Sequence, residues 1–510
     1  MGFSELSVCS FMDMLTPFIV GFGIALTPEN LTYALVGCLI GTLVGVLPGI
    51  GSAGGMAILL PLTFKLPPTG AIIMLSAIFY GSYYGGTIST VLMKTPGEVA
   101  SVVTLLDGTA MARQGRGGVA LTIAAFGSFI GGTIAVMGLV LLAPALTDVA
   151  LKFGPTEFFS LLVVGLATLS LLAGGSVWKS IAMAAFGMLL GTIGTDPTMG
   201  SPRFDFGLTP LLGGLDFVPV MMGLFGLSEI LLAAEQKPAV VERQRLRDLY
   251  PSFEDLKKSN GSIWRGTVVG FFLGLIPGTT QALASFISYG VERGVSKNPE
   301  RFGHGAIEGV AGPETANNAH ANAALIPLFT LGIPGSPSIA ILLGAFTING
   351  LAPGPLLFSE RPEIVWPIIA SMIIGNFMLL LLNVPLVGMW VKILQIPNRI
   401  LAPVIVMFMC LGTYLASNSV FDIGVLIVFG ILGAAFKKLD FPLTPIALTI
   451  IIGPMMEQAL RQSMTISRGD VSIFFTRPLS ACLLIVAMIV LTMPLWRPRI
   501  ASARRDLGPE

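Results

Sequence analysis

Four Pro-Gly phrases interrupt long apolar stretches of the chain, and they fall at matched positions in its two halves. Residues 48–49 correspond to residues 277–278, and residues 96–97 correspond to residues 334–335, at offsets of 229 and 238 residues. A proline breaks the hydrogen-bond ladder of a helix, so free N–H and C=O groups are left at the interruption. Free N–H groups suit carboxylates, and free C=O groups suit Na⁺ or a carried proton. Interruptions matched between two halves are typical of the binding site of a secondary transporter.

The candidate substrate-binding residues are those of the four phrases and the small or hydroxylated residues beside them. Glycine lets the backbone approach a ligand closely, and Ser and Thr hydroxyls add neutral hydrogen-bonding groups. One such phrase alone is explained by ordinary helix kinking, whereas four at matched positions favour a site. The candidates are Pro48, Gly49, Gly51, Ser52, Thr95, Pro96, Gly97, Pro277, Gly278, Thr279, Thr280, Pro334, Gly335 and Ser336.

A polar segment at residues 308–322 leads into the last of these phrases. Amide and carboxyl groups at membrane depth are costly to bury and are usually functional. Glu308 either lines a site or caps a helix at the membrane surface, and Lys94 either attracts an anion or extends to the surface. The candidate ligands of a coupling cation are Glu314, Asn317 and Asn318.

The composition is that of a membrane protein. Hydrophobic residues make up 54% of the 510 residues and charged residues 11%, whereas a soluble domain carries about 25% charged residues. Charge-free runs meet or approach the ~20 residues that a membrane-spanning helix needs; they cover residues 117–147, 158–178, 266–291, 364–391 and 478–496. A net charge of +1 without a basic stripe argues against nucleic-acid binding. His304 and His320 have no metal-ligand partner at a suitable spacing, so we expect no metal site.

The similarity between the two halves divides the chain into units. The loop at residues 237–265 holds seven basic and four acidic residues, so the positive-inside rule places it in the cytoplasm. The predicted divisions are an N-terminal segment (1–30), a first repeat unit (31–235), a cytoplasmic basic loop (236–261), a second repeat unit (262–465), and a last transmembrane helix with a basic tail (466–510).

The charge pattern also predicts how the units lie in the membrane. Residues 266–291 are charge-free but are flanked by basic loops at both ends, and 26 residues are too few for two crossings. We therefore expect a re-entrant helical hairpin with its tip at residues 277–280. The basic loops change sides between the units, which predicts an inverted repeat. The expected fold is an all-α polytopic membrane protein with two inverted repeats, re-entrant hairpins, broken helices and about 11–12 transmembrane helices.

Glycines four residues apart predict close helix packing rather than ligand contacts. These pairs are Gly41/Gly45, Gly81/Gly85 and Gly270/Gly274.

Six short motifs of the chain are L-P-G-I-G at 47–51, Y-G-G-T-I-S at 84–89, K-T-P-G at 94–97, G-A-I-E-G-V-A at 305–311, P-E-T-A-N-N at 313–318 and L-G-I-P-G at 331–335. Through these motifs the chain resembles the large membrane subunit of the tripartite tricarboxylate transporters (TctA-like). The resemblance covers essentially the whole chain. Family members more often have Ala-Ala or Gly-Gly where this chain has His320-Ala321-Asn322.

The resemblance implies a system of three proteins in the bacterial inner membrane and periplasm. A periplasmic solute-binding protein (TctC-like) captures a carboxylate, a small membrane subunit (TctB-like) assists, and the large subunit moves the carboxylate inward. An ion gradient of Na⁺ or H⁺ supplies the energy, and no other cofactor is expected. Two further classes are a self-contained channel or secondary transporter with re-entrant loops for another small anion, and a membrane-embedded enzyme. The enzyme has little support, because it needs a nucleophile–base pair or a metal cluster at depth.

Overall fold

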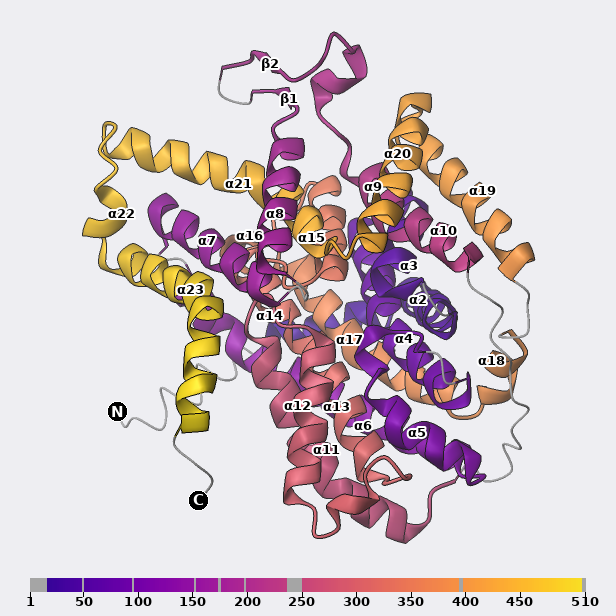
Figure 1. Ribbon diagram of the computed structural model, residues 1–510. Coiled ribbons are helices and arrows are strands. Elements are labelled where there is room, and N and C mark those ends of the chain that lie inside the picture. The colour runs from indigo at the N-terminus through magenta and orange to yellow at the C-terminus, as the bar shows by residue number, and fades with distance from the viewer. Residues whose placement is uncertain are drawn as a thin grey trace.

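The computed structural model describes residues 16–47, 50–93, 96–150, 153–172, 176–196, 199–235, 250–393 and 398–506 (Figure 1). Its elements are helices apart from one short hairpin of two strands in the described part of the chain. Strands β1 (Gly194–Thr195) and β2 (Pro202–Arg203) pair antiparallel, with Thr195 opposite Pro202. This hairpin projects from one end of the molecule, at the top of Figure 1.

The first half of the chain begins with a helix at Thr16–Ala25. It continues with α2 (Pro28–Val46), α3 (Gly51–Leu59), α4 (Pro68–Met93), α5 (Thr104–Arg113), α6 (Gly117–Ala150), α7 (Pro155–Leu172), α8 (Val177–Gly191), α9 (Phe217–Met221) and α10 (Ser228–Glu235). Short 3₁₀ turns lie at Leu60–Thr63, Val99–Ser101 and Thr209–Gly213, and a π-helical segment, Met222–Leu227, joins α9 to α10.

The second half comprises α11 (Phe253–Gly274), α12 (Gln281–Val295), α13 (Glu308–Ala323), α14 (Leu325–Leu331), α15 (Pro337–Ile348), α16 (Pro355–Glu360), α17 (Pro362–Asn383), α18 (Val387–Ile393), α19 (Asn398–Ser417), α20 (Val420–Lys438), α21 (Thr444–Ile466), α22 (Ile473–Thr476) and α23 (Pro478–Asp506). A 3₁₀ turn lies at Pro299–Arg301. As predicted, residues 277–280 join two helices, α11 and α12.

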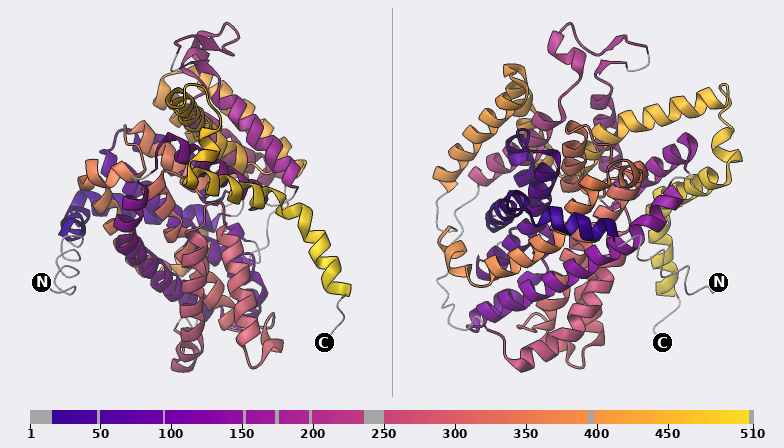
Figure 2. Two further views of the ribbon diagram at one scale, coloured as in Figure 1. Left: turned by 90° about the vertical axis from the view of Figure 1, so that its left-hand side faces the viewer. Right: turned by 180° about the vertical axis from the view of Figure 1, so that it is seen from behind.

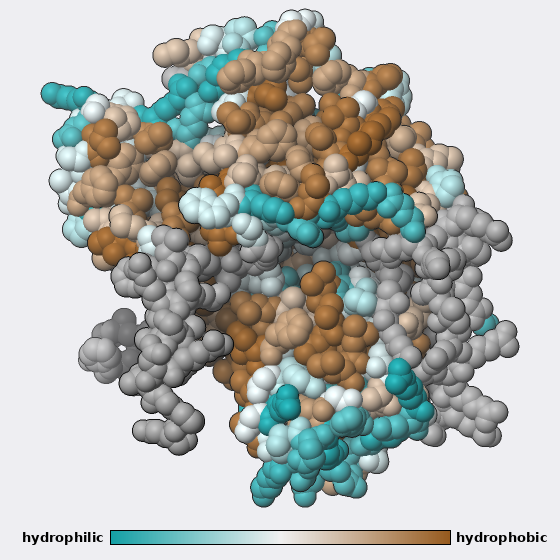
Figure 3. All heavy atoms as spheres, viewed as in Figure 1, coloured by the Kyte–Doolittle hydropathy of each residue, from teal (hydrophilic) through white to brown (hydrophobic). Residues whose placement is uncertain are grey.

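Six helices of the described chain are long and apolar enough to cross a membrane: Pro28–Val46, Pro68–Met93, Gly117–Leu142, Phe217–Glu235, Pro362–Asn383 and Val420–Lys438. Apolar side chains cover much of the surface in Figure 3, and hydrophilic residues gather at its lower end. In Figure 1 this end carries the start of α11 and the end of α12. The prediction of a polytopic α-helical membrane protein is therefore confirmed.

Glycines allow the central helices to pack at backbone contact. A Cβ atom on Gly41 would lie 2.6 Å from the carbonyl oxygen of Ile78, where α2 crosses α4. In the second half, a Cβ on Gly270 would lie 2.9 Å from Cα of Ala316, where α11 crosses α13. The prediction that these glycines serve helix packing is confirmed. Helix α4, which α2 covers, is buried from Gly70 to Met93.

The buried carboxylate of Asp107 holds the loop that leads into α13. Asp107 of α5 accepts hydrogen bonds through Oδ1 from the backbone N–H groups of Gly303 (2.9 Å), Gly305 (2.8 Å) and Ala306 (2.8 Å). Its Oδ2 accepts a hydrogen bond from the Tyr289 hydroxyl at 3.0 Å. The first half of the chain thus holds the loop that precedes α13. Helix α6 runs obliquely past this assembly, as Figure 2 shows from behind.

Candidate functional site

The first hairpin tip joins α2 to α3. Pro48 and Gly49 lie outside the described residues, and the described part of the tip begins at Ile50. Gly51 has a φ of +65°, which a residue with a side chain rarely adopts. The backbone N–H of Ser52 donates a hydrogen bond to the carboxylate of Glu98, and the Ser52 hydroxyl lies 2.9 Å from the hydroxyl of Ser338. The second Pro-Gly phrase of each half, Pro96-Gly97 in the first half and Pro334-Gly335 in the second, is called here the first break and the second break. The first tip therefore contacts the segments that follow both breaks.

The second hairpin tip joins α11 to α12. Gly278 has a φ of +89°, and the Thr279 hydroxyl lies 2.5 Å from the carbonyl of Leu273 and 2.9 Å from that of Ile276. Thr280 caps α12, because its hydroxyl accepts a hydrogen bond from the Leu283 N–H at 3.2 Å. The hydroxyls thus shape this tip and satisfy part of its free backbone.

The second break lies directly against the second tip. A Cβ atom on Gly335 would lie 3.6 Å from the backbone nitrogen of Gly278 and 3.8 Å from Cα of Pro277. Ser336 caps α15 by accepting a hydrogen bond from the Ile339 N–H at 3.3 Å. Pro334 lies in the same non-helical stretch, between the end of α14 and the start of α15.

The first break follows α4, and its residues Lys94 and Thr95 lie outside the described residues. Gly97 packs against Gly86, because a Cβ atom on Gly97 would lie 2.8 Å from Cα of Gly86. Pro96 precedes Gly97 directly. The 3₁₀ turn that follows packs against α12 of the other half. The described parts of the two tips and the two breaks are thus connected in one central region.

The Glu314 carboxylate is the centre of a second polar cluster. It is fully buried and accepts hydrogen bonds from the hydroxyls of Thr87 (2.6 Å) and Thr104 (2.5 Å) and from the side-chain amide of Asn317 (3.1 Å). Thr87 belongs to α4 and Thr104 to α5, so three helices supply this cluster. All three groups lie within hydrogen-bonding distance of the carboxyl oxygens, which offsets the cost of burying them.

Buried amides extend the cluster along α13. The Asn318 amide nitrogen lies 2.6 Å from Oδ1 of Asn317 and 2.8 Å from the hydroxyl of Ser128. The Asn322 amide donates to the carbonyl of Asn318 at 2.9 Å. Oδ1 of Asn318 and Oδ1 of Asn322 have no hydrogen-bond partner among the residues that the structure describes. These two oxygens therefore remain available as ligands. The cluster is called here the Glu314 cluster and consists of Thr87, Thr104, Ser128, Glu314, Asn317, Asn318 and Asn322.

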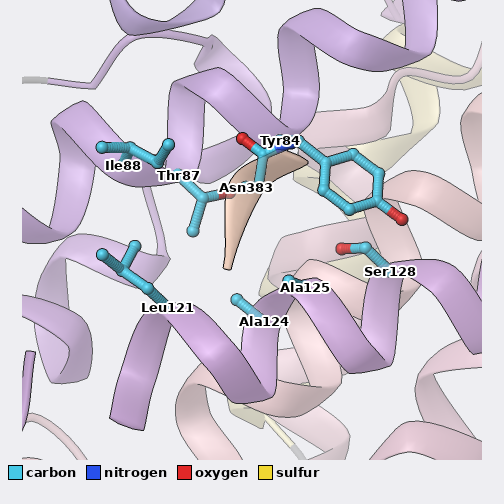
Figure 4. Close-up of a pocket in the computed structure, with 8 residues that line it drawn as sticks. All are labelled: Tyr84, Thr87, Ile88, Leu121, Ala124, Ala125, Ser128 and Asn383. Carbon is cyan, nitrogen blue, oxygen red and sulfur yellow. The ribbon is translucent and has the colours of Figure 1, made fainter. Parts of the chain in front are cut away.

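A small pocket of about 10 Å³, room for about one water molecule, adjoins the Glu314 cluster. Figure 4 shows its lining: Tyr84, Thr87 and Ile88 from α4, Leu121, Ala124, Ala125 and Ser128 from α6, and Asn383 from α17. In the described part of the chain, the Tyr84 hydroxyl and Oδ1 of Asn383 have no hydrogen-bond partner. Buried polar groups normally find a partner, so free ones mark a place for a polar ligand or solvent.

Several residues of these clusters were not predicted from the sequence. Glu98, Thr104 and Ser128 are distant along the chain from the groups that they contact. For Glu98 a signal existed, because it directly follows the Pro96-Gly97 phrase. Glu308, for which two roles were open, is the first residue of α13. At this position the helix dipole stabilises a negative charge.

The arrangement offers two kinds of ligand groups. Helix N-termini at the tips present N–H groups for anions, and the Glu314 cluster presents carboxylate, hydroxyl and amide oxygens for a hard cation. Within the described ranges no three His, Cys, Asp or Glu side chains group together as metal ligands. His320 instead lies beside the second tip, with its Nε2 2.8 Å from the Thr279 hydroxyl.

Comparison with known proteins identifies relatives of the chain. The chain is 47% identical over 494 residues to a protein of Agrobacterium vitis described as "Uncharacterized 52.8 kDa protein in TAR-I ttuC' 3'region", covering 97% of this chain and 98% of that protein. A second protein of Agrobacterium vitis, "Uncharacterized protein in TAR-II ttuC' 3'region", is 49% identical over 241 residues, which is 47% of this chain and 99% of that protein. No solved structure matches. The profile of the Tripartite tricarboxylate transporter TctA family matches residues 31–448, and the chain therefore belongs to this family.

Proposed function

We propose that the chain is the permease of an ion-gradient-driven, binding-protein-dependent carboxylate importer in the bacterial inner membrane. Its family makes it the large membrane subunit of a tripartite tricarboxylate transporter and not an enzyme. A periplasmic solute-binding protein (TctC-like) delivers the carboxylate, and a small membrane subunit (TctB-like) completes the complex. The observation that carries the proposal is the meeting of tips and breaks from both halves of the chain, at Ser52–Glu98–Ser338 and at Gly278–Gly335.

The two units, 31–235 and 262–465, are related by inversion in this proposal. Reciprocal helix contacts support it: α3 packs on α15 while α12 packs on the 3₁₀ turn Val99–Ser101. Likewise α6 packs on α13 while α4 packs on α17, and α8 packs on α21 while α20 packs on α9 and α10. A twofold relation between two copies of one unit produces contacts that come in such pairs. The first phrase of each unit is then a re-entrant hairpin tip and the second an interrupted crossing.

Carboxylate binding is assigned to the tips and breaks. The ends of α3 and α12 present N–H groups with partial positive charge, and glycine lets a ligand approach that backbone. The residues assigned are those predicted from the sequence, including Pro48, Gly49 and Thr95, which lie outside the described residues.

Cation coupling is assigned to Glu314, Asn317 and Asn318. The burial of Glu314 and the free oxygen of Asn318 support it, since Na⁺ prefers oxygen ligands and a proton needs a carboxylate. Because Thr87 and Thr104 of the first unit bind Glu314 of the second, occupation of this cluster biases how the units sit against each other. A rocking or elevator motion then exposes the tips to alternate sides.

Uptake of radiolabelled citrate by cells expressing all three components tests the proposal. Gly278→Leu should abolish uptake without loss of expression, because a side chain at a φ of +89° deforms the tip. Gly290→Leu is the matched control, since Gly290 lies on α12 with open space around its Cβ position. Normal uptake by Gly278→Leu would remove the site assignment. Accumulation against a gradient that an ionophore abolishes excludes the alternative, a passive anion channel.

A further inference from the structure

The first hairpin tip already holds a carboxylate, and that carboxylate belongs to the chain itself. Oε1 of Glu98 accepts the Ser52 N–H at the start of α3. A Cβ atom on Gly51 would lie 3.8 Å from Oε2 of Glu98, so the carboxylate faces the turn that opens the helix. Glu98 is 9% exposed, and Gly86 admits it, because a Cβ atom on Gly86 would lie 2.9 Å from that of Glu98. The anion position of this tip is filled.

No described residue plays this part at the second tip. At the offset of 238 residues that relates the two breaks, Glu98 corresponds to Ser336. Ser336 is neutral, and its hydroxyl caps its own helix, α15. Among the described residues, no Asp or Glu side chain accepts a hydrogen bond from the backbone of the first turn of α12, where the Leu283 N–H donates to the neutral Thr280 hydroxyl. The N–H groups of the two tips are therefore used differently.

Two buried polar groups at the second tip have no partner among the described residues. Gln281 is the first residue of α12 and is 7% exposed, yet its amide nitrogen donates to no group in the described part of the chain. His320 contacts the tip through Thr279, and its Nδ1 has no partner there either. A free N–H donor buried beside the positive end of a helix matches an anionic oxygen.

We propose that Glu98 is a built-in carboxylate ligand of the first hairpin tip and that the transported carboxylate binds at the second tip, beside Gln281. The inference rests on the proposed function and narrows it: of the two tips assigned there to carboxylate binding, only the second receives the substrate, because the Ser52 N–H of the first is already bonded to Glu98. Because Ser52 also contacts Ser338, the internal ligand holds the first tip in place against the other unit. The two tips then have different tasks: one is structural and the other carries the substrate.

Chemical rescue tests the role of Glu98 in proteoliposomes that contain the complete three-component system. Glu98→Ala should lower citrate transport about tenfold or more, and millimolar formate should restore a large part of it, because formate fits the vacated carboxylate position. Glu98→Gln keeps the shape of the side chain and should be impaired without a response to formate. A folded Glu98→Ala protein that formate does not rescue overturns the proposal. If Glu98→Ala does not fold, transport by Glu98→Gln at the wild-type rate overturns it.

A charge placed at the second tip tests where the substrate binds. Ser336→Glu recreates the arrangement of Glu98 and should transport citrate about tenfold or more below Ser336→Gln, its size-matched reference. Gln281→Glu is isosteric, replaces the free donor with an acceptor, and should raise the citrate concentration needed for half-maximal transport by about tenfold or more. Equal transport by the two Ser336 variants, or unchanged citrate dependence in Gln281→Glu, overturns the assignment of this tip. If the wild-type system transports none of a panel of di- and tricarboxylates, that result overturns the proposed function itself, independently of the variants.

Discussion

The hydroxyl oxygens of Ser52 and Ser338 lie 2.9 Å apart, although 286 residues separate them in the chain. Ser52 belongs to the first hairpin, and Ser338 lies in the first turn of the helix that follows the last Pro-Gly phrase. The contact joins the hairpin of one half to the broken helix of the other. Any motion that separates the halves at this point must break it.

A disulfide between these positions should arrest transport. In a background without Cys9, Cys38, Cys410 and Cys482, Ser52→Cys with Ser338→Cys should crosslink on oxidation, because the side chains are within disulfide reach. Citrate uptake should stop and return with a reductant, and mass spectrometry should detect the crosslinked peptides. The two single-cysteine variants should not respond to the oxidant. Uptake at the uncrosslinked rate by the oxidised double variant would mean that the contact persists throughout the cycle.

Glu314→Gln should impair cation-coupled uptake. The substitution removes the negative charge that the hydroxyls of Thr87 and Thr104 and the amide of Asn317 surround, and with it the group that would bind Na⁺ or carry a proton. We expect uptake to fall about tenfold or more and the dependence on Na⁺ or on pH to change. Glu360→Gln, at an exposed position, is the control. Unchanged ion dependence in Glu314→Gln would assign coupling to another site.

Gly270→Ala should destabilise the protein, whereas Gly290→Ala should not. A methyl group at Gly270 would lie 2.9 Å from Cα of Ala316, so α11 and α13 must move apart. Overpacking of this kind costs about 1–3 kcal/mol, while alanine at an open helical position gains about 0.5–1 kcal/mol over glycine. Thermal unfolding in detergent, followed by size-exclusion chromatography, compares the two. Equal unfolding temperatures would contradict the packing described here.

Asp107→Ala should release the loop before α13. Three backbone N–H groups lose their acceptor, and each buried unpaired group costs about 1–3 kcal/mol. Trypsin should then cleave after Arg301 faster than in the wild type. Glu300→Ala, on the exposed face of the same loop, serves as the control. Resistance of Asp107→Ala equal to that of the wild type would show that other contacts hold the loop.

Acid should loosen the start of α11. Partial burial disfavours the ionised Asp255 carboxylate, but hydrogen bonds from Ser252 and the charge of Arg116 outweigh this and lower the pKa of Asp255. A group whose pKa is lower in the folded state contributes stability above its unfolded pKa of about 4 and loses it as the pH falls through the folded value. Unfolding temperatures measured from pH 6 to pH 3 should fall less steeply for Asp255→Asn than for the wild type. Parallel curves would show that another titrating group causes the loss of stability in acid.

The sequence predicted those features that depend on neighbouring residues. Proline and glycine end helices locally, so the ends of α2, α11 and α14 follow from the phrases themselves. Glu98 and Thr104 could not be placed in the same way, because their partners, Ser52 and Glu314, lie 46 and 210 residues away. Their contacts depend on how the halves pack. In the Glu314 cluster, Glu314, Asn317 and Asn318 were singled out because they lie in the polar segment at residues 308–322. The hydroxyls that complete the cluster come from other helices.

Helix α6 has 34 residues, which corresponds to a length of about 51 Å. A bilayer core is about 30 Å thick, so a helix of this length lies at a steep slant or extends beyond the hydrocarbon. It packs on α13, where its Ser128 is part of the Glu314 cluster, and on α17. Both of these helices belong to the second half of the chain. Because the helix is one continuous rod, a displacement of Ser128 at the Glu314 cluster would also move the part of α6 that packs on α17.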